Sequence, residues 1–211
     1  MKTKLLTIFT LGLIVFSSCS KYPPSSIRLT EDLVIYTKYD VTADFNTYKT
    51  FSVVPKVAYI NGKDTAYLTD ANAMALLDQI SKNMLKRGFV TATGSTKPDL
   101  GINVTAIKNT TTTVYSPGWY WGYPGYYSPG WWGYPDYGYG YPYYPTYITS
   151  YSTGTVLIDM VDFKTPIDGK VMVRWNAYIR GLLTGSHTQS DVLRSIDQAF
   201  IQTPTLKTTP N

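Results

Sequence analysis

Three stretches of the sequence repeat apolar residues at every second position, and this period constrains the fold more than any other feature of the chain. Residues 100–106, 156–160 and 171–177 each follow it. A period of two places alternate side chains on opposite faces of a sheet, so each stretch is expected to be a strand. Asp168-Gly169, a dipeptide typical of tight turns, predicts a hairpin between the last two stretches. The apolar residues of 171–177 are expected to share one face.

Two other segments carry apolar residues at helical spacing. The first is expected to begin at a cap, Thr69 or Asp70, and to end near Arg87. The second has Ser186 and Gln189 at the spacing of a capping box. Their apolar stripes are Ala73, Leu76, Leu77, Ile80 and Met84 in the first and Val192, Leu193, Ile196, Ala199 and Phe200 in the second.

Further strands are expected at residues 33–39 and 48–54, and Asn61-Gly62 predicts a loop or a small hairpin within 57–66. The order along the chain is then two strands, a helix, several strands and a second helix. This order predicts an α+β fold: one mostly antiparallel sheet with two amphipathic helices on one face.

Residues 115–151 form a segment rich in tyrosine, tryptophan, glycine and proline, and they contain most of the chain's 20 tyrosines. Proline and glycine both disfavour long regular elements, so a Tyr/Gly/Pro-rich loop insertion between two strands is expected. Asp136 is its only charged residue.

Three interpretations of this segment remain open: an insert without a function of its own, partly packed on the domain; a contact surface for a protein; and a platform for sugar rings. Tyrosine and tryptophan dominate the energetics of protein interfaces, and aromatic faces also stack on sugars. The candidate ligand or partner contacts are Trp119, Trp121, Trp131, Trp132, Tyr134 and Tyr141.

Composition and motifs favour a non-enzymatic protein. His187 is the only histidine, which leaves little material for acid–base catalysis or a histidine metal site. Asp159, Asp162 and Asp168 do not have the spacing of an EF-hand loop, and no phosphate-binding or dinucleotide motif is present. No catalytic residue, metal or cofactor is therefore expected. The formal net charge is +5, or +3 without Lys2 and Lys4 of the segment expected to be removed, and this charge is too small and scattered for a nucleic-acid footprint.

The first residues predict export. Lys2 and Lys4 precede an apolar run of roughly 12 residues, which is too short to span a membrane and typical of a signal peptide. Ser17 and Ser18 stand directly before Cys19, the only cysteine, and this junction resembles the lipobox of bacterial lipoproteins. The resemblance implies lipidation of Cys19, cleavage before it, and acylation of the new amino terminus, for example with palmitate.

Several motifs in the remaining chain, in this order, resemble the DUF4136 lipoprotein family. They are Asp44-Phe45 with Tyr48-Lys49-Thr50-Phe51, then Arg87-Gly88-Phe89, Pro98-Asp99-Leu100, Gly154-Thr155-Val156-Leu157-Ile158-Asp159 and Val173-Arg174-Trp175. The resemblance runs from about residue 40 to 204, without the aromatic insertion. It implies an exported lipoprotein with an α+β domain and transfers no catalytic residue.

The expected organisation is a signal peptide at 1–18, a lipid-anchored tether at 19–30, a domain at 31–204 with its insertion at 115–151, and a tail at 205–211. Ser20 after the cysteine resembles the outer-membrane sorting signal, and no acidic run follows, which favours a periplasm-facing domain. The leading hypothesis is a non-enzymatic envelope lipoprotein that scaffolds protein contacts through the aromatic loop. The alternative is a glycan- or peptidoglycan-binding module that uses the same loop.

Replacing Cys19 with Ala is expected to release the protein from the membrane, because the acyl chains supply the binding free energy at about 0.8 kcal/mol per buried CH₂. Cell fractionation and intact mass measure the effect. Unchanged membrane association of the variant, together with a wild-type mass that shows no lipid, would contradict the assignment.

Overall fold

The computed structural model describes residues 33–94, 96–109, 118–141, 154–183 and 187–209. All of them belong to one compact unit, Glu31–Asn211. Cys19 and the expected signal peptide and tether lie outside the described residues, as do the two ends of the predicted insertion. The described part of that insertion, residues 118–141, is called the aromatic segment below.

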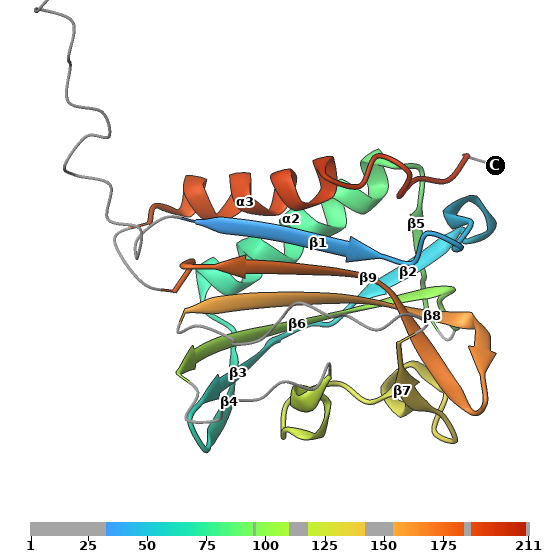
Figure 1. Cartoon of the computed structure of the whole chain (residues 1–211), viewed down its shortest axis with the longest axis horizontal. Helices are drawn as coiled ribbons and strands as arrows, with labels where there is room; N and C mark the ends of the chain where they lie inside the picture. The colour runs from blue at the N-terminus through green and yellow to red at the C-terminus, as the bar shows by residue number, and fades with distance from the viewer. Residues whose placement is uncertain (1–32, 95, 110–117, 142–153, 184–186, 210–211) are drawn as a thin grey trace, which may run out of the picture. The chain divides into compact units, whose positions relative to one another are not determined.

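The described strands form one sheet (Figure 1). They are β1 (Val34–Tyr39), β2 (Thr50–Val53), β3 (Val57–Asn61), β4 (Asp64–Leu68), β5 (Val90–Thr91), β6 (Leu100–Asn109), β7 (Gly138–Gly140), β8 (Thr155–Ile167) and β9 (Lys170–Arg180). The long strands β6, β8 and β9 are antiparallel neighbours and form the centre. The mixed α/β class and the mostly antiparallel sheet predicted from the sequence are confirmed.

Shorter strands share the two outer edges of this centre. Antiparallel β1 pairs with the second half of β9, and parallel β7 pairs with its beginning. On the other edge, β2 and then β3 run parallel to β6, with β5 beyond β2 and β4 beyond β3. The segment predicted as a loop or small hairpin is therefore a hairpin, β3–β4, that extends the sheet.

Helices α2 (Ala71–Lys86) and α3 (Gln189–Ile201) lie side by side along the top of Figure 1. The Asp70 side chain accepts hydrogen bonds from the backbone of Asn72 and Ala73, which confirms one of the two predicted caps. The capping box of α3 is formed by Thr188 and Asp191, so the predicted pair was wrong. Both pairs have the same spacing, and the box is simply placed two residues later.

The apolar stripes of both helices join residues of β6, β8 and β9 in one core. Ile80 of α2 and Ile196 of α3 are fully buried there. Trp175 of β9 lies under α3, with its ring centroid 5.0 Å from that of Phe200. Its indole nitrogen donates a 2.9 Å hydrogen bond to the Thr203 hydroxyl, so the large side chain is buried without an unpaired polar atom.

The alternation of β9 is interrupted at Arg174. Trp175 and Val173 pair with consecutive residues of β8, so Arg174 is an extra residue, as in a β-bulge. Side chains directly opposite one another on antiparallel strands share a face. Val173 lies opposite Val161, which lies opposite Gly101, and Gly101 faces the aromatic segment. Val173 thus lies on that side and Trp175 on the helix side, so the predicted single apolar face is wrong.

The bulge places Arg174 in a buried ionic cluster. Its guanidinium forms ion pairs with Asp40, which follows β1, and with Asp162 of β8, where Nε lies 3.0 Å from Oδ2. The hydroxyl of Tyr48 also donates to Asp162, at 3.0 Å. Burial favours a raised pKa for Asp40, but hydrogen bonds from Thr42 and Arg174 outweigh it and lower the pKa. The cluster joins the β8–β9 hairpin to the segment that follows β1, more than 110 residues earlier in the sequence.

Replacing Arg174 with Met is expected to destabilise the fold by about 3–5 kcal/mol, because it leaves two buried carboxylates without their cation. Urea unfolding measures the free energy change. Arg180→Met, at the exposed end of the same strand, is the control and should change stability by less than about 0.5 kcal/mol. Equal stabilities of the two variants would show that the cluster does not need its cation.

Candidate functional site

The aromatic segment contains two short 3-10 helices, η3 (Trp119–Gly122) and η4 (Pro129–Trp132), and the short strand β7. The segment lies along the bottom of Figure 1. Pro129 occupies the first turn of η4, where its fixed φ suits a helix start. Gly133 ends the same turn with φ +89°, a left-handed conformation that favours glycine. The glycines and prolines thus form successive tight turns that bring many aromatic rings together.

Asp159 of β8 is the main polar anchor of this layer. It is 1% exposed, and it accepts hydrogen bonds from the hydroxyls of Tyr126 at 2.9 Å and Tyr120 at 3.1 Å. The indole nitrogen of Trp121 donates a longer one at 3.4 Å, and the side-chain amide of Asn176 donates another. Three donors therefore come from the aromatic segment and one from the neighbouring strand.

The sheet register explains why these groups meet. Asn103, Asp159 and Asn176 lie directly opposite one another on β6, β8 and β9, and together they form a polar row across the sheet. The Asn103 amide donates to the backbone oxygen of Tyr127 and to the Tyr139 hydroxyl, both at 3.2 Å. All three residues of the row are buried, so the row binds the aromatic segment in a site that excludes water.

Burial is the largest influence on the pKa of the Asp159 carboxyl and raises it, although the hydrogen bonds from Asn176, Tyr126 and Tyr120 act in the opposite direction. Burial also raises the pKa of Tyr126 well above its ordinary value, and the charge of Asp159 adds to this effect. The phenol therefore stays protonated at neutral pH and remains a hydrogen-bond donor. This arrangement holds the segment in place, and its buried carboxylate is not accessible to a substrate.

A second contact depends on Gly101 of β6. A Cβ atom at this position would collide with the Phe163 ring and would lie 3.0 Å from the Trp132 indole. The absence of a side chain lets these rings lie directly on the strand, with their centroids 5.2 Å apart. Tyr134 stacks on the Phe163 ring, with the two ring centroids 4.7 Å apart and an interplanar angle of 5°.

The structure places the predicted contact residues in different surroundings. Trp132 is buried, Trp121 is half-buried and stacks on Tyr141 at 4.9 Å, and Tyr134 is half-buried on Phe163. Trp119 begins η3. Among the predicted contact residues whose exposure the structure describes, Trp131 has the most exposed side chain, at 47%. Internal packing thus uses several of these rings, and Trp131 is the one most available to a partner.

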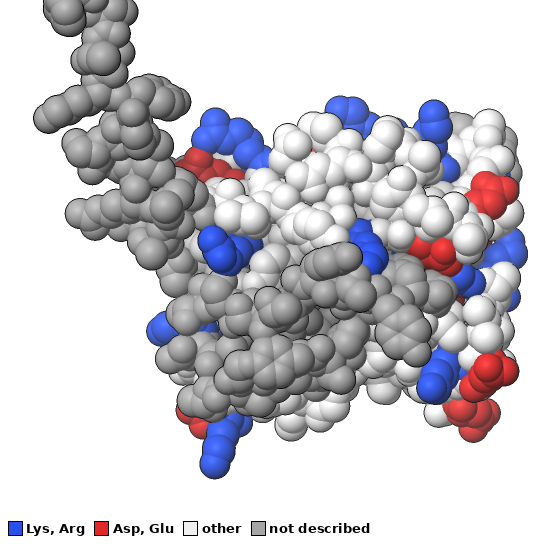
Figure 2. All heavy atoms as spheres, viewed as in Figure 1, with Lys and Arg blue, Asp and Glu red and all other residues white. Residues whose placement is uncertain are grey.

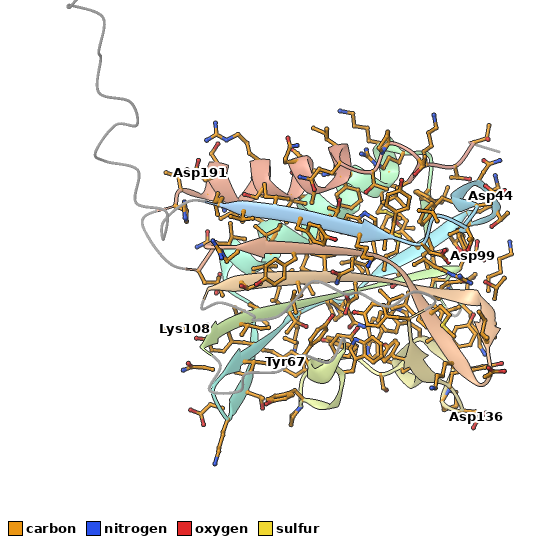
Figure 3. The ribbon with its side chains drawn as sticks, in the orientation of Figure 1. Asp44, Tyr67, Asp99, Lys108, Asp136 and Asp191 are labelled. Atoms are coloured by element: carbon orange, nitrogen blue, oxygen red, sulfur yellow. The ribbon has the colours of Figure 1, made fainter. Side chains whose placement is uncertain are left out.

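Trp131 belongs to a surface aromatic cluster that also contains Tyr127 and Tyr67. The centroid distances are 5.0 Å from Trp131 to Tyr127 and 5.7 Å from Tyr127 to Tyr67. Tyr67 comes from β4 and is 45% exposed; Figure 3 shows it at the lower edge of the sheet. Lys56 lies over its ring at 5.4 Å. Sequence reasoning missed Tyr67 because only the sheet brings it to the aromatic segment.

The three aspartates considered as possible metal ligands or a carboxylate pair do not converge. Asp159 faces the aromatic segment, Asp162 binds Arg174, and Asp168 occupies the β8–β9 turn with a positive φ. Within the described ranges, no group of three or more acidic, histidine or cysteine side chains could hold a metal ion. Figure 2 shows basic and acidic side chains scattered over the described part of the visible face.

Replacing Asp159 with Asn is expected to flatten the pH dependence of stability. A carboxyl whose pKa is raised by folding binds its proton more tightly in the folded state, so the contribution of Asp159 to stability falls as the pH rises above 3.8 and stays lower once the folded carboxyl has ionised. The Asp159→Asn variant has no carboxyl at this position, so it does not lose stability in this way. Melting temperatures between about pH 4 and about pH 8 measure the slope. Asp136→Asn, at an exposed turn, is the matched control. Parallel slopes for wild type and Asp159→Asn would contradict the expectation.

Comparisons with known proteins agree with the motifs. The family model described as a domain of unknown function, DUF4136, matches residues 35–205. The crystal structure of a DUF4136 family protein from Bacteroides thetaiotaomicron is similar, with a TM-score of 0.72 and 35% identity, over 83% of this chain and 97% of that chain. Among curated proteins no match was found. Within the described residues, no helix is long and apolar enough to cross a membrane.

Two weaker structural likenesses carry no functional argument. A PDZ domain protein from Parabacteroides distasonis has a TM-score of 0.42 and 16% identity, over 83% of this chain and 37% of that chain. A PelC dodecamer from Paraburkholderia phytofirmans has a TM-score of 0.40 and 12% identity, over 84% of this chain and 99% of that chain. The family match and the first structure cover most of the chain, so the protein belongs to the DUF4136 family.

Proposed function

We propose that this protein is a lipid-anchored, non-enzymatic component of the bacterial envelope, periplasm-facing at the outer membrane, that binds a protein partner through its surface aromatic cluster. The lipid on Cys19 would hold it at the membrane. The α+β domain, with both helices on one face of the sheet, would carry the aromatic segment on the other face. No cofactor takes part in this role.

The observation that carries the proposal is the exposure of Trp131 beside Tyr127 and Tyr67. A large aromatic side chain that remains 47% exposed forfeits much of the hydrophobic free energy that its burial would supply. Its neighbours are well packed: Trp132, next in sequence, is buried, with its ring centroid 5.0 Å away. A rigid exposed aromatic group on a packed base is typical of interface hot spots, because little conformational entropy is lost when a partner covers it.

A photo-crosslinking amino acid at position 131 tests the proposal in intact envelopes. A discrete crosslinked species is expected there, and Tyr67→Ala in the same chain should weaken it. The control position is Ile201, which is 63% exposed at the end of α3. The same products from both positions, or none from position 131, would reject the partner contact.

A glycan is the second candidate ligand, because an exposed tryptophan ring also suits stacking on a sugar. Co-sedimentation with purified peptidoglycan separates the two candidates. Sedimentation that Trp131→Ala abolishes without loss of fold would favour the glycan over a protein partner.

A further inference from the structure

Strand β4 is an edge strand of the sheet, at the lower left of Figure 1. It pairs with β3 along one side, and its other side pairs with no described strand. Native proteins usually protect such an edge with a proline, a bulge or charged residues, because free backbone groups invite another strand. Residues 65–68 of β4 contain no proline and no charged residue, and their register with β3 is regular. This edge is therefore suited to pairing.

The geometry of the β3–β4 hairpin shows which backbone groups point outwards. Asn61 and Asp64 lie opposite one another across a two-residue turn, whose first residue, Gly62, has φ +65°. A tight turn of this kind joins its flanking residues by backbone hydrogen bonds, and bonded pairs then recur at every second position. The N–H and C=O groups of Thr65 and Tyr67 consequently point away from β3. Within the described part of the chain, no hydrogen bond reaches these groups.

The two outward positions are self-complementary. In an antiparallel pairing of two copies about a two-fold axis at Ala66, Thr65 of each copy lies opposite Tyr67 of the other. Both are then hydrogen-bonded pairs, in which each residue donates its N–H and accepts with its C=O. Ala66 faces Ala66 of the second copy in the non-bonded position between them, where Cα atoms lie about 4.5 Å apart. Its small side chain suits this close approach.

The side chains that meet across this axis are compatible. Tyr67 opposite Thr65 is a pair of an aromatic and a β-branched side chain, which favours strand pairing. Asp64 would lie opposite Leu68, and the flanking Lys63 would lie beyond that pair. No like charges are therefore directly opposite one another in this register, which would otherwise oppose the association of two identical strands.

The same pairing would cover an exposed tyrosine. Tyr67 is 45% exposed, lies at the edge labelled in Figure 3, and belongs to the surface aromatic cluster through its contact with Tyr127. Diagonal neighbours on antiparallel strands lie about 7–8 Å apart, within reach of aromatic side chains. The two Tyr67 residues would be diagonal neighbours across the axis. The surface aromatic clusters of two copies would then join into one strip.

From these observations we infer that the protein partner is a second copy of this chain, and that two copies pair along their β4 strands, antiparallel about a two-fold axis at Ala66, into one continuous sheet. The inference rests on the proposed protein contact and names its partner. A closed two-fold contact occupies the β4 edge of both copies, so this pairing produces a dimer.

A cysteine at position 66 tests the axis in intact envelopes. Two Cα atoms about 4.5 Å apart lie within the range that a disulfide spans. Mild oxidation is therefore expected to link most Ala66→Cys chains into a species of twice the mass, which a non-reducing gel shows and reduction removes. Wild type under the same oxidation controls for Cys19.

Asp64→Cys, at an exposed position of the same strand, is the matched control. Residue 64 pairs with residue 68 in this register, so the two cysteines would be roughly 13 Å apart and should not form a disulfide. No dimer from Ala66→Cys, or equal dimer from both variants, would overturn the inference.

A proline at position 65 tests the backbone pairing. Thr65→Pro removes the outward N–H, and a strand edge tolerates proline where this group faces solvent. In the Ala66→Cys chain it should slow disulfide formation about tenfold, because each copy loses one hydrogen bond across the axis. Thr65→Val keeps the N–H and the branched shape and should leave the rate unchanged. Melting temperatures verify that both variants fold. Equal rates in the folded variants would overturn the strand pairing.

The photo-crosslink from position 131 distinguishes this inference from the proposed function. A product with a different protein, without a disulfide at position 66, would overturn the inference and leave the proposed partner contact standing. A disulfide at position 66 without any product from position 131 would support the pairing of β4 and remove Trp131 from the contact.

Discussion

Strand β8 is buried on both faces from Thr155 to Phe163, and this constraint explains most of the structure around it. Water cannot reach a polar side chain in this stretch, so each needs a partner inside the protein. Asp159 finds tyrosines and an asparagine on one side of the sheet, and Asp162 finds Arg174 on the other. The two carboxylates are only three residues apart, yet each organises a different layer.

The partners of the two aspartates differ in their chemistry. Asp162 is paired with a cation, and breaking such a pair leaves a buried charge, which makes the ionic cluster a structural element of the fold. Asp159 is surrounded by neutral donors, so the aromatic segment is attached by hydrogen bonds that hold as long as the tyrosines keep their protons. A segment rich in glycine and proline thus acquires a defined conformation through contacts to the sheet, and this conformation presents Trp131 to the solvent.

Two of the motifs that resemble the DUF4136 family contact one another in the structure. Asp99 accepts hydrogen bonds from the backbone of Lys49 at 2.7 Å and Thr50 at 3.1 Å, and the Thr50 hydroxyl accepts one from the Asp99 backbone at 2.9 Å. Two motifs that lie far apart in sequence therefore join β2 to the start of β6. These hydrogen bonds hold β2 against the start of β6.

Local patterns in the sequence were enough to predict the central strands and both helices and to narrow the cap of α2 to Thr69 or Asp70, because period, propensity and capping depend on residues a few positions apart. Tertiary structure alone decided the bulge at Arg174, which reverses the facing of Val173, and the partners of Asp159 and Asp162. It also decided which rings are buried and that Tyr67 joins Trp131. These features depend on strand register and on packing between distant segments, and no local pattern encodes either.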